Sequence, residues 1–219
     1  MEDNSHIKYY NSKHEEVPSV TTILKLYGKN LSQWANWLGF KRINVNDYLN
    51  SRANYGTYVH SVAEKFFNDN ASQYADLEYI NQLNYNKLIN KLTFMKDTLS
   101  KQGYEVYTTE LVMHGEKYGG TADIIFYNKD KDKYLLLDFK TSKAVYRTMF
   151  MQLAGYTQLI KETNDIDVSD VGIILIEKDI TDKSFSTIVK VENNTSNLTI
   201  FNHLLDIYYL LSPDDIKYL

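Results

Sequence analysis

The segment from Gly119 to Ser142 constrains the fold of this 219-residue chain more than any other stretch. Two apolar runs flank the wholly polar sequence of residues 128–133, which is rich in turn-forming residues. This pattern predicts an antiparallel β-hairpin. Asp138 and Lys140 lie near the end of the second strand of this hairpin. Because a strand turns successive side chains to opposite faces, these two residues share one face and the apolar residues beside them point to the other face.

The hairpin turn also predicts which acids lie opposite each other. With the turn centred in the middle of the polar run, Asp123 lies opposite Asp138, and directly opposed side chains have Cβ atoms about 4.5–5.5 Å apart. The alternating run over residues 104–113 predicts a preceding strand, and the turn that follows it places Glu110 opposite Asp123. We therefore expect three acids and Lys140 to cluster across three neighbouring strands.

Such a cluster predicts a metal site. Close carboxylates raise one another's pKa and resist joint ionisation unless a cation neutralises them. Hard oxygen ligands suit Mg²⁺ or Mn²⁺, which remain partly hydrated and complete their coordination with water and substrate phosphate. The ion lowers the pKa of bound water and polarises a phosphoryl oxygen, while the lysine orients the water. These residues therefore indicate phosphodiester hydrolysis.

The amino-acid composition excludes several kinds of functional site. The chain contains no cysteine, which excludes disulfides, thiol catalysis, cysteine-ligated zinc and an iron–sulfur cluster. No apolar run approaches the roughly 18 residues of a membrane span, and the polar start is not a signal peptide. We expect no membrane partner and a cytoplasmic location in a bacterial or phage-infected cell.

Charge is distributed unevenly along the chain, whose net charge is −4. Residues 1–66 carry eight Lys and Arg against six acids, whereas residues 160–219 carry five against eleven. Any bound nucleic acid is therefore expected to lie against the first two thirds of the chain.

The remaining pattern predicts an α/β fold with a mixed central sheet flanked by helices. Residues 1–17 show no pattern and are expected to be frayed, and a short helix begins after Pro18. Both Trp34 and Trp37 are expected in the core, with base stacking as the alternative. We expect an N-terminal helical region, residues 1–102, and a core, residues 103–219. Together these two regions are expected to form one compact domain. The expected helices cover residues 31–40, 53–70, 76–102, 144–162 and 199–211, and two further strands cover 171–177 and 185–191.

The 53–70 helix carries Gly56, His60 and Glu64 four residues apart, so they share one stripe. A single histidine on an amphipathic helix is more often structural than a ligand. A glycine one turn before it permits close approach of backbone or ligand, which favours the functional interpretation.

The 144–162 helix carries Gln152 and Tyr156 one turn apart, with Lys143 and Arg147 near its start. A helix N-terminus beside a metal site suits phosphate, through free amides and the helix dipole. An amphipathic helix packed on the sheet explains Gln152 and Tyr156 equally well.

Six motifs occur in the order found in RecB-like members of the PD-(D/E)XK nuclease superfamily, which the chain resembles over about residues 18–156. They are Pro18-Ser19-Val20-Thr21, Gly56-x-x-x-His60, Glu110, Gly120-Thr121-Ala122-Asp123, Asp138-Phe139-Lys140 and Gln152-x-x-x-Tyr156. The resemblance implies a restriction-endonuclease-like core over residues 103–219.

By this resemblance, Asp123 and Asp138 would be metal ligands, with the Phe139 carbonyl and His60 as further ligands. Lys140 would position or activate the attacking water. The ion would be Mg²⁺ or Mn²⁺, and the absent cysteines separate the chain from the iron–sulfur relatives.

The resemblance also implies roles around the metal. Glu110 would be the acid of the first core strand, whose role in the family varies, and Gln152 and Tyr156 would organise the active site and the DNA strand. Lys143 and Arg147 are further candidates for substrate binding.

The family implies a stand-alone exonuclease of phage or mitochondrial-genome-maintenance type. Its substrate would be single-stranded DNA or free DNA ends, in replication, recombination or repair, with phage or host replication and recombination proteins as partners. The alternatives are a structure-specific or restriction-like endonuclease and a non-catalytic DNA-binding assembly subunit.

Overall fold

A five-stranded mixed sheet forms the centre of the computed structural model, which describes residues 7–28, 32–68, 82–142, 144–176, 188–192 and 195–216. The strand order is β3-β4-β5-β6-β7, antiparallel except for the parallel pair β5–β6. The expected α/β class and mixed sheet are confirmed. The strands are β3 Tyr104–His114, β4 Gly119–Asn128, β5 Lys133–Lys140, β6 Val168–Leu175 and β7 Ile188–Glu192.

The register of the first three strands is the one that the turns predict. Ile124 pairs with Leu137, which is the register that aligns position 123 with position 138. On the other side, Thr109 pairs with Ile124 and Leu111 with Ala122, so positions 110 and 123 are aligned between them. The polar run at residues 128–133 forms the turn of the hairpin, as expected.

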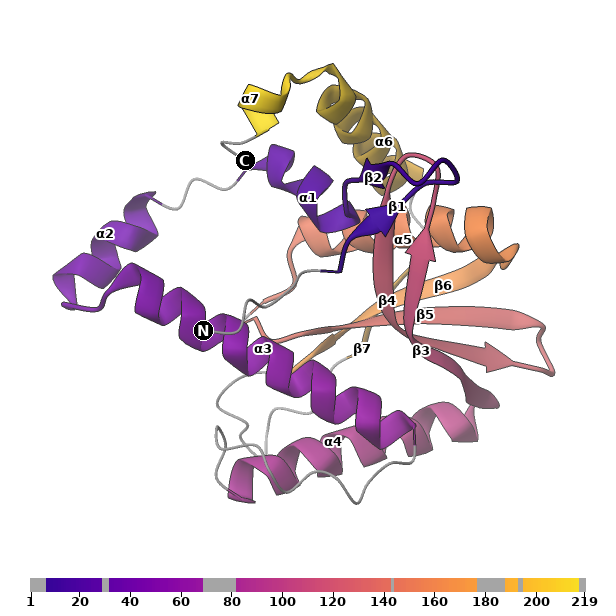
Figure 1. Cartoon of the computed structure of the whole chain (residues 1–219). Coiled ribbons are helices and arrows are strands. Elements are labelled where there is room, and N and C mark those ends of the chain that lie inside the picture. Colours follow the sequence, from indigo (N-terminus) through magenta and orange to yellow (C-terminus); the bar gives the residue numbers. More distant parts are fainter. Residues whose placement is uncertain are drawn as a thin grey trace.

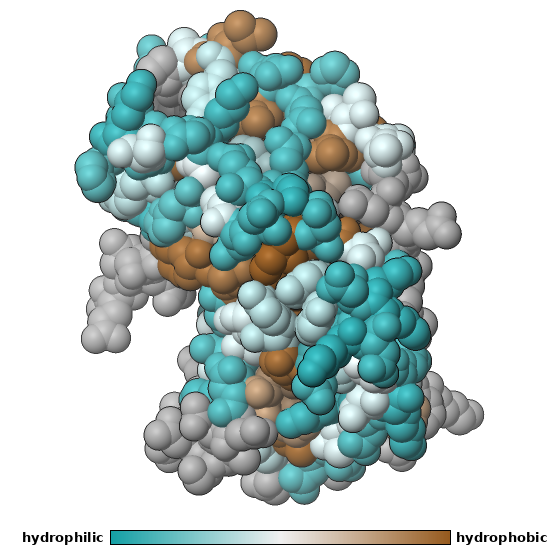
Figure 2. Space-filling view, turned by 90° about the vertical axis from the view of Figure 1, so that its right-hand side faces the viewer, coloured by the Kyte–Doolittle hydropathy of each residue, from teal (hydrophilic) through white to brown (hydrophobic). Residues whose placement is uncertain are grey.

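Helices cover both faces of the sheet (Figure 1). On one face, α3 (Val45–Phe67) and α4 (Gln82–Lys101) enclose an apolar core with the sheet, and on the other, α1 (Val20–Leu24), α5 (Arg147–Asn164) and α6 (Thr195–Leu210) enclose a second core. Seen from the side, apolar residues gather in a band at mid-height, between more hydrophilic surfaces above and below (Figure 2). The functional residues therefore lie on a sheet held between two helical layers.

The helices differ from expectation mainly at their ends. The helix expected over 53–70 begins eight residues earlier, because the Asn44 side chain accepts hydrogen bonds from the amides of Asn46 and Asp47 and caps α3. Ser19 caps α1 by accepting a bond from the Thr22 amide. Residues 69–70 and 76–81 lie outside the described part of the chain. Short helices Lys25–Tyr27 (η1) and Pro213–Ile216 (α7) complete the set among the described residues.

The expectation of a frayed start is wrong for the described residues before Pro18. β1 (Tyr9–Tyr10) pairs with β2 (Glu16–Val17), and the Tyr9 ring packs directly on Gly119. Strands of two residues are too short to show any periodicity in the sequence. Residues 1–6 are outside the described part.

The core position expected for both tryptophans is wrong for Trp37. Both lie on α2 (Ser32–Phe40), where Trp37 is 54% exposed and Trp34 is half-buried against the ring of Tyr48. Helical spacing identified the element but not which of its faces is exposed. Of the strand expected at 185–191, residues 185–187 are not described.

Candidate active site

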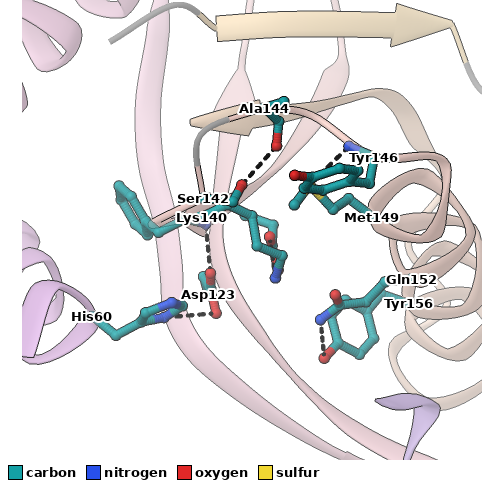
Figure 3. Close-up of polar contacts among 11 residues, drawn as sticks. His60, Asp123, Lys140, Ser142, Ala144, Tyr146, Met149, Gln152 and Tyr156 are labelled. Carbon is teal, nitrogen blue, oxygen red and sulfur yellow. Dashed lines mark hydrogen bonds and ion pairs between the residues drawn. The ribbon is translucent and has the colours of Figure 1, made fainter. Parts of the chain in front are cut away.

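The candidate site lies where β4 and β5 stop pairing. The last paired residues are Ile124 and Leu137, and beyond them the Phe139 amide donates to Asp123 Oδ2 at 2.7 Å instead of to a backbone carbonyl of β4 (Figure 3). The Asp123 carboxylate thus accepts a hydrogen bond that a backbone carbonyl of β4 would accept in a regular sheet. This bond fixes the orientation of the carboxylate between the two strands.

At this point, the regular alternation of side chains between the two faces of the sheet is interrupted in both β3 and β4. Ile124 belongs to the core under α3 and α4, whereas Ala122, two residues away, belongs to the core under α5. In a regular strand, residues two apart share a face. Glu110, aligned with position 123, has φ +46°, in the left-handed region that side chains with a Cβ rarely adopt. The break in alternation therefore centres on the two acids and turns them toward α3.

Three metal-binding side chains meet there. One ligand atom each from His60, Glu110 and Asp123 lies within 4.8 Å of the other two, and His60 Nδ1 is 3.4 Å from Asp123 Oδ1. A metal ion with bonds of about 2.0–2.6 Å spans ligands up to about 4–5 Å apart across it. The cluster joins a residue of α3 to residues of two consecutive strands, β3 and β4, which follow α3 much later in the sequence.

His60 reaches the cluster because α3 runs close to the end of β5. One turn earlier, a Cβ on Gly56 would lie 3.5 Å from Thr141 Oγ1, an ordinary van der Waals distance. The His60 ring also meets the Phe139 ring edge-on at 6.1 Å. The position of His60 is therefore set by packing against the end of β5.

Asp138 and Lys140 form a buried ion pair beside this cluster. Lys140 Nζ lies 2.6 Å from Asp138 Oδ2, and the two share one face of β5, as the strand pattern predicts. Asp138 is only 2% exposed, and its Oδ1 has no hydrogen-bond partner among the residues that the structure describes. A buried carboxylate oxygen without a partner is costly, so it points to a ligand.

The electrostatics of the site also favour a cation. Burial, together with the Asp123 carboxylate, raises the pKa of Glu110 to about 7. Burial raises the pKa of Asp138 above its ordinary value, although Lys140 opposes the shift. Burial lowers the pKa of His60, but the adjacent Asp123 outweighs it and the net shift is upward. Burial is the main cause for the two acids, and neighbouring carboxylates add to all three shifts; a divalent ion would offset both effects.

The donor set fits a divalent metal ion. His60, Glu110 and Asp123 would supply one nitrogen and two carboxylate ligands, and the free Oδ1 of Asp138 is the next available oxygen. For Phe139, the structure places the amide against Asp123, and a metal contact of its carbonyl stays a prediction.

Gln152 and Tyr156 face the strands from α5, opposite His60 (Figure 3). Gln152 Nε2 donates to the Tyr156 hydroxyl at 2.9 Å, and both residues are buried. Burial first, and then the charge of Asp138, raise the pKa of Tyr156. The pair therefore lies close enough to Asp138 and Asp123 for their charges to act on Tyr156. Arg147 is exposed in the first turn of α5, and Lys143 lies outside the described residues.

Two further residues belong to the surroundings of the site. The charge of Glu64, one turn after His60 on α3, contributes to the raised pKa of Glu110. The hydroxyls of Tyr9 and Thr121 are 2.9 Å apart, which ties the N-terminal hairpin to β4. The four-residue spacing of His60 and Glu64 in the sequence indicated that Glu64 lies near the site. Nothing in the sequence indicated the contact between Tyr9 and Thr121.

No protein-family model and no curated protein matches the chain. Among solved structures, it is similar to SSO0001 at 17% identity and a TM-score of 0.30, over 55% of this chain and 57% of that one. The chain thus spans little more than half the length of that structure. It is similar to the alkaline exonuclease LHK-Exo from Laribacter hongkongensis at 10% identity and a TM-score of 0.37, over 59% and 69% of the two chains.

A third similar structure is a phage-related exonuclease from Haemophilus somnus 129PT, at 14% identity and a TM-score of 0.37, over 87% and 90% of the two chains. Likeness at these scores does not bear on activity. Among the helices of the described residues, none is both long and apolar enough to cross a bilayer.

Proposed function

We propose that this chain is a metal-dependent deoxyribonuclease that hydrolyses phosphodiester bonds in single strands or at free ends of DNA. The observation that carries the proposal is the meeting of His60, Glu110 and Asp123 beside the buried pair of Asp138 and Lys140. Four separate elements contribute to it, and no packing requirement explains three acids at one strand end.

The protein side chains have separable roles in this proposal. His60, Glu110 and Asp123, with Asp138 Oδ1, would hold Mg²⁺ or Mn²⁺, and a nitrogen ligand favours Mn²⁺ of the two. When bound, the ion lowers the pKa of a water molecule and polarises the phosphoryl oxygen.

Lys140 acts as a donor in this arrangement. Burial lowers the pKa of its ammonium group, but Asp138 and Asp123 outweigh that effect and hold it in the charged form. An ammonium group has three N–H donors, and Asp138 takes one, so the others can orient the attacking water and stabilise negative charge on the phosphate.

The buried pair Gln152 and Tyr156 borders the acids from α5, and we propose that this pair and the exposed Arg147 in the first turn of α5 position the DNA strand. Lys143 belongs to the same proposal. The pathway that we propose is replication, recombination or repair, with phage or host proteins of those processes as partners.

The test compares one DNA molecule in two forms. A covalently closed circle and the same DNA made linear are incubated with the protein and Mn²⁺ or Mg²⁺, with chelator as control. We expect metal-dependent loss of the linear form while the circle persists. Cleavage of the circle would establish endonuclease action instead, and no metal-dependent cleavage of either form would refute the proposed function.

A further inference from the structure

The helix pair at the outer end of α3 exposes large apolar side chains. We use the name α2–α3 arm for residues 32–52, which extend beyond the sheet (Figure 1). Within this arm, Trp37 is 54% exposed and Phe40 is 89% exposed. Trp37 and Phe40 stand at positions i and i+3, so they lie on one side of α2, and Lys41 directly follows the helix.

A line of contacts connects α2 to α3. The ring of Trp34 meets that of Tyr48 at 5.6 Å. Arg52 Nη2 donates to the Tyr48 hydroxyl at 3.1 Å, and the guanidinium carbon lies 5.3 Å from the centre of the same ring. An aromatic pair and a cation therefore connect α2 with α3.

The same line continues to the candidate active site. Arg52, Gly56 and His60 follow each other at four-residue intervals along α3, and a Cβ on Gly56 would lie 3.5 Å from Thr141, directly after β5. At about 1.5 Å per residue, Arg52 lies about 12 Å along the helix from His60.

The charge of the arm suits a polyanion. Residues 32–52 contain three basic residues, Lys41, Arg42 and Arg52, against the single acid Asp47, a local charge of +2 on a chain of −4. Lys41 and Arg42 are exposed directly after the aromatic turn of α2. Exposed rings beside cations are typical of surfaces that bind single-stranded nucleic acid, because bases stack on the rings and phosphates pair with the cations.

We propose that the α2–α3 arm binds the unpaired strand of a DNA substrate and leads it along α3 to the active site. Bases stack on Trp37 and Phe40, and Lys41, Arg42 and Arg52 neutralise phosphates. A duplex keeps its bases stacked on each other and cannot use the rings in this way. This inference rests on the proposed function and adds the strand-binding surface to it.

Tryptophan emission reports on this surface alone, because both tryptophans of the chain, Trp34 and Trp37, lie in α2. The protein is titrated in chelator, where no cleavage occurs, with an oligothymidylate of about 16 nucleotides. We expect saturable quenching by the single strand and little change with a blunt duplex of the same length. Absence of quenching by the single strand would overturn the inference.

Substitutions separate stacking from general loss of apolar surface. Trp37→Ala with Phe40→Ala should weaken single-strand binding at least about tenfold, measured by the anisotropy of a labelled oligonucleotide. Phe94→Ala with Leu210→Ala removes side chains of nearly equal exposure, 53% and 85%, and should leave the affinity unchanged. Trp37→Phe with Phe40→Tyr keeps aromatic faces and should retain most of the affinity.

Unchanged affinity in the alanine pair, or equal losses in the matched control, would overturn the inference. A change of oligomeric state in the alanine pair with DNA affinity intact would likewise overturn it and identify a second copy of the chain as the occupant. Because binding is measured without metal, this result is independent of hydrolysis. A wild-type protein that digests DNA without binding it through the arm refutes this inference and leaves the proposed function standing.

Discussion

Glu110 is the only strand residue with positive φ in the part of the chain that the structure describes. Its backbone is strained, its side chain is partly buried, and the nearby Asp123 adds charge repulsion. Strain of this kind persists only where the surroundings enforce it, and it concentrates at functional sites. Glu110 is therefore expected to lower the stability of the metal-free protein, a cost that fits the ligand role proposed for it.

Replacing this residue should expose the conflict between stability and function. Glu110→Asn removes the charge, and asparagine tolerates the left-handed region better than glutamate. We expect the metal-free protein to become more stable by about 1 kcal/mol in denaturant unfolding at neutral pH, while calorimetry shows weaker Mn²⁺ binding.

The matched control is Glu105→Asn, an exposed acid earlier on the same strand, which should change neither quantity appreciably. A Glu110→Asn protein that binds Mn²⁺ as wild type does would show that Glu110 is not a ligand.

The positions of the two turns in the sequence predicted the alignment of residues 110, 123 and 138, because the pairing of strands in a hairpin is set by the turn that joins them. The side to which the acids turn was not predictable in this way. It depends on the positive φ of Glu110 and on the Phe139 amide that orients Asp123, and both arise from tertiary packing. For the same reason, the His60 stripe was visible in the sequence while its contact with Asp123 was not.

Among the elements, the contact between α5 and β4 explains the glycine of the Gly120-Thr121-Ala122-Asp123 motif. A Cβ at position 120 would lie 2.6 Å from Cε1 of Tyr156, whose ring is buried in the core under α5. The ring cannot move freely, because Gln152 holds its hydroxyl. Gly120 thus sets the distance between α5 and the strand that carries Asp123.

Gly120→Ala should therefore cost about 1–3 kcal/mol in the free energy of unfolding and lower the rate of DNA hydrolysis, since overpacking displaces Tyr156. Gly39→Ala is the matched control. A Cβ there meets nothing within 4 Å, so alanine should stabilise α2 by about 0.5–1 kcal/mol. Equal effects of the two substitutions on unfolding would contradict the packing explanation.

The elements themselves were largely predictable, because long helices and the alternating strands carry strong periodicity. The β1–β2 hairpin was missed, since two-residue strands have no period, and Trp37 was placed in the core because spacing alone does not reveal which face lacks a partner.

At the scale of the whole molecule, the site lies on the sheet between the two helical layers, and its charged groups affect how these layers pack together. His60 comes from the α3 layer, the acids come from the sheet, and the buried Tyr156 lies on the α5 layer. Without a cation, ionisation of these acids opposes assembly of the layers around the strand end. The stability of the whole fold is therefore expected to depend on pH and metal together.

In chelator, the free energy of unfolding should fall as pH rises from about 5 to about 7.5. The pKa of Glu110 is raised from its ordinary value of 4.5 to about 7, so the folded state binds more protons than the unfolded state across that window. The pKa values of Asp138 and His60 are raised as well and give the same sign. Mn²⁺ should stabilise the protein more at pH 7.5 than at pH 5, because its ligands must lose protons.

Thermal unfolding at several pH values, with and without metal, measures both effects. In Glu110→Gln the decline in chelator should be shallower. Stability that rises with pH in chelator, or a larger metal effect at pH 5, would contradict the assigned charges.

The most direct test of the central claim is the rate of nucleotide release from end-labelled single-stranded DNA, measured for wild type and Lys140→Ala with Mn²⁺ and with chelator. Lys140→Ala removes the donor beside Asp138 and leaves that buried carboxylate without its cation, so the variant should be less stable than wild type, still show the circular dichroism spectrum of a folded protein, and lose hydrolysis by at least about 100-fold. The wild type should release nucleotides only with metal. Wild-type turnover by Lys140→Ala, or hydrolysis that persists in chelator, would contradict the account.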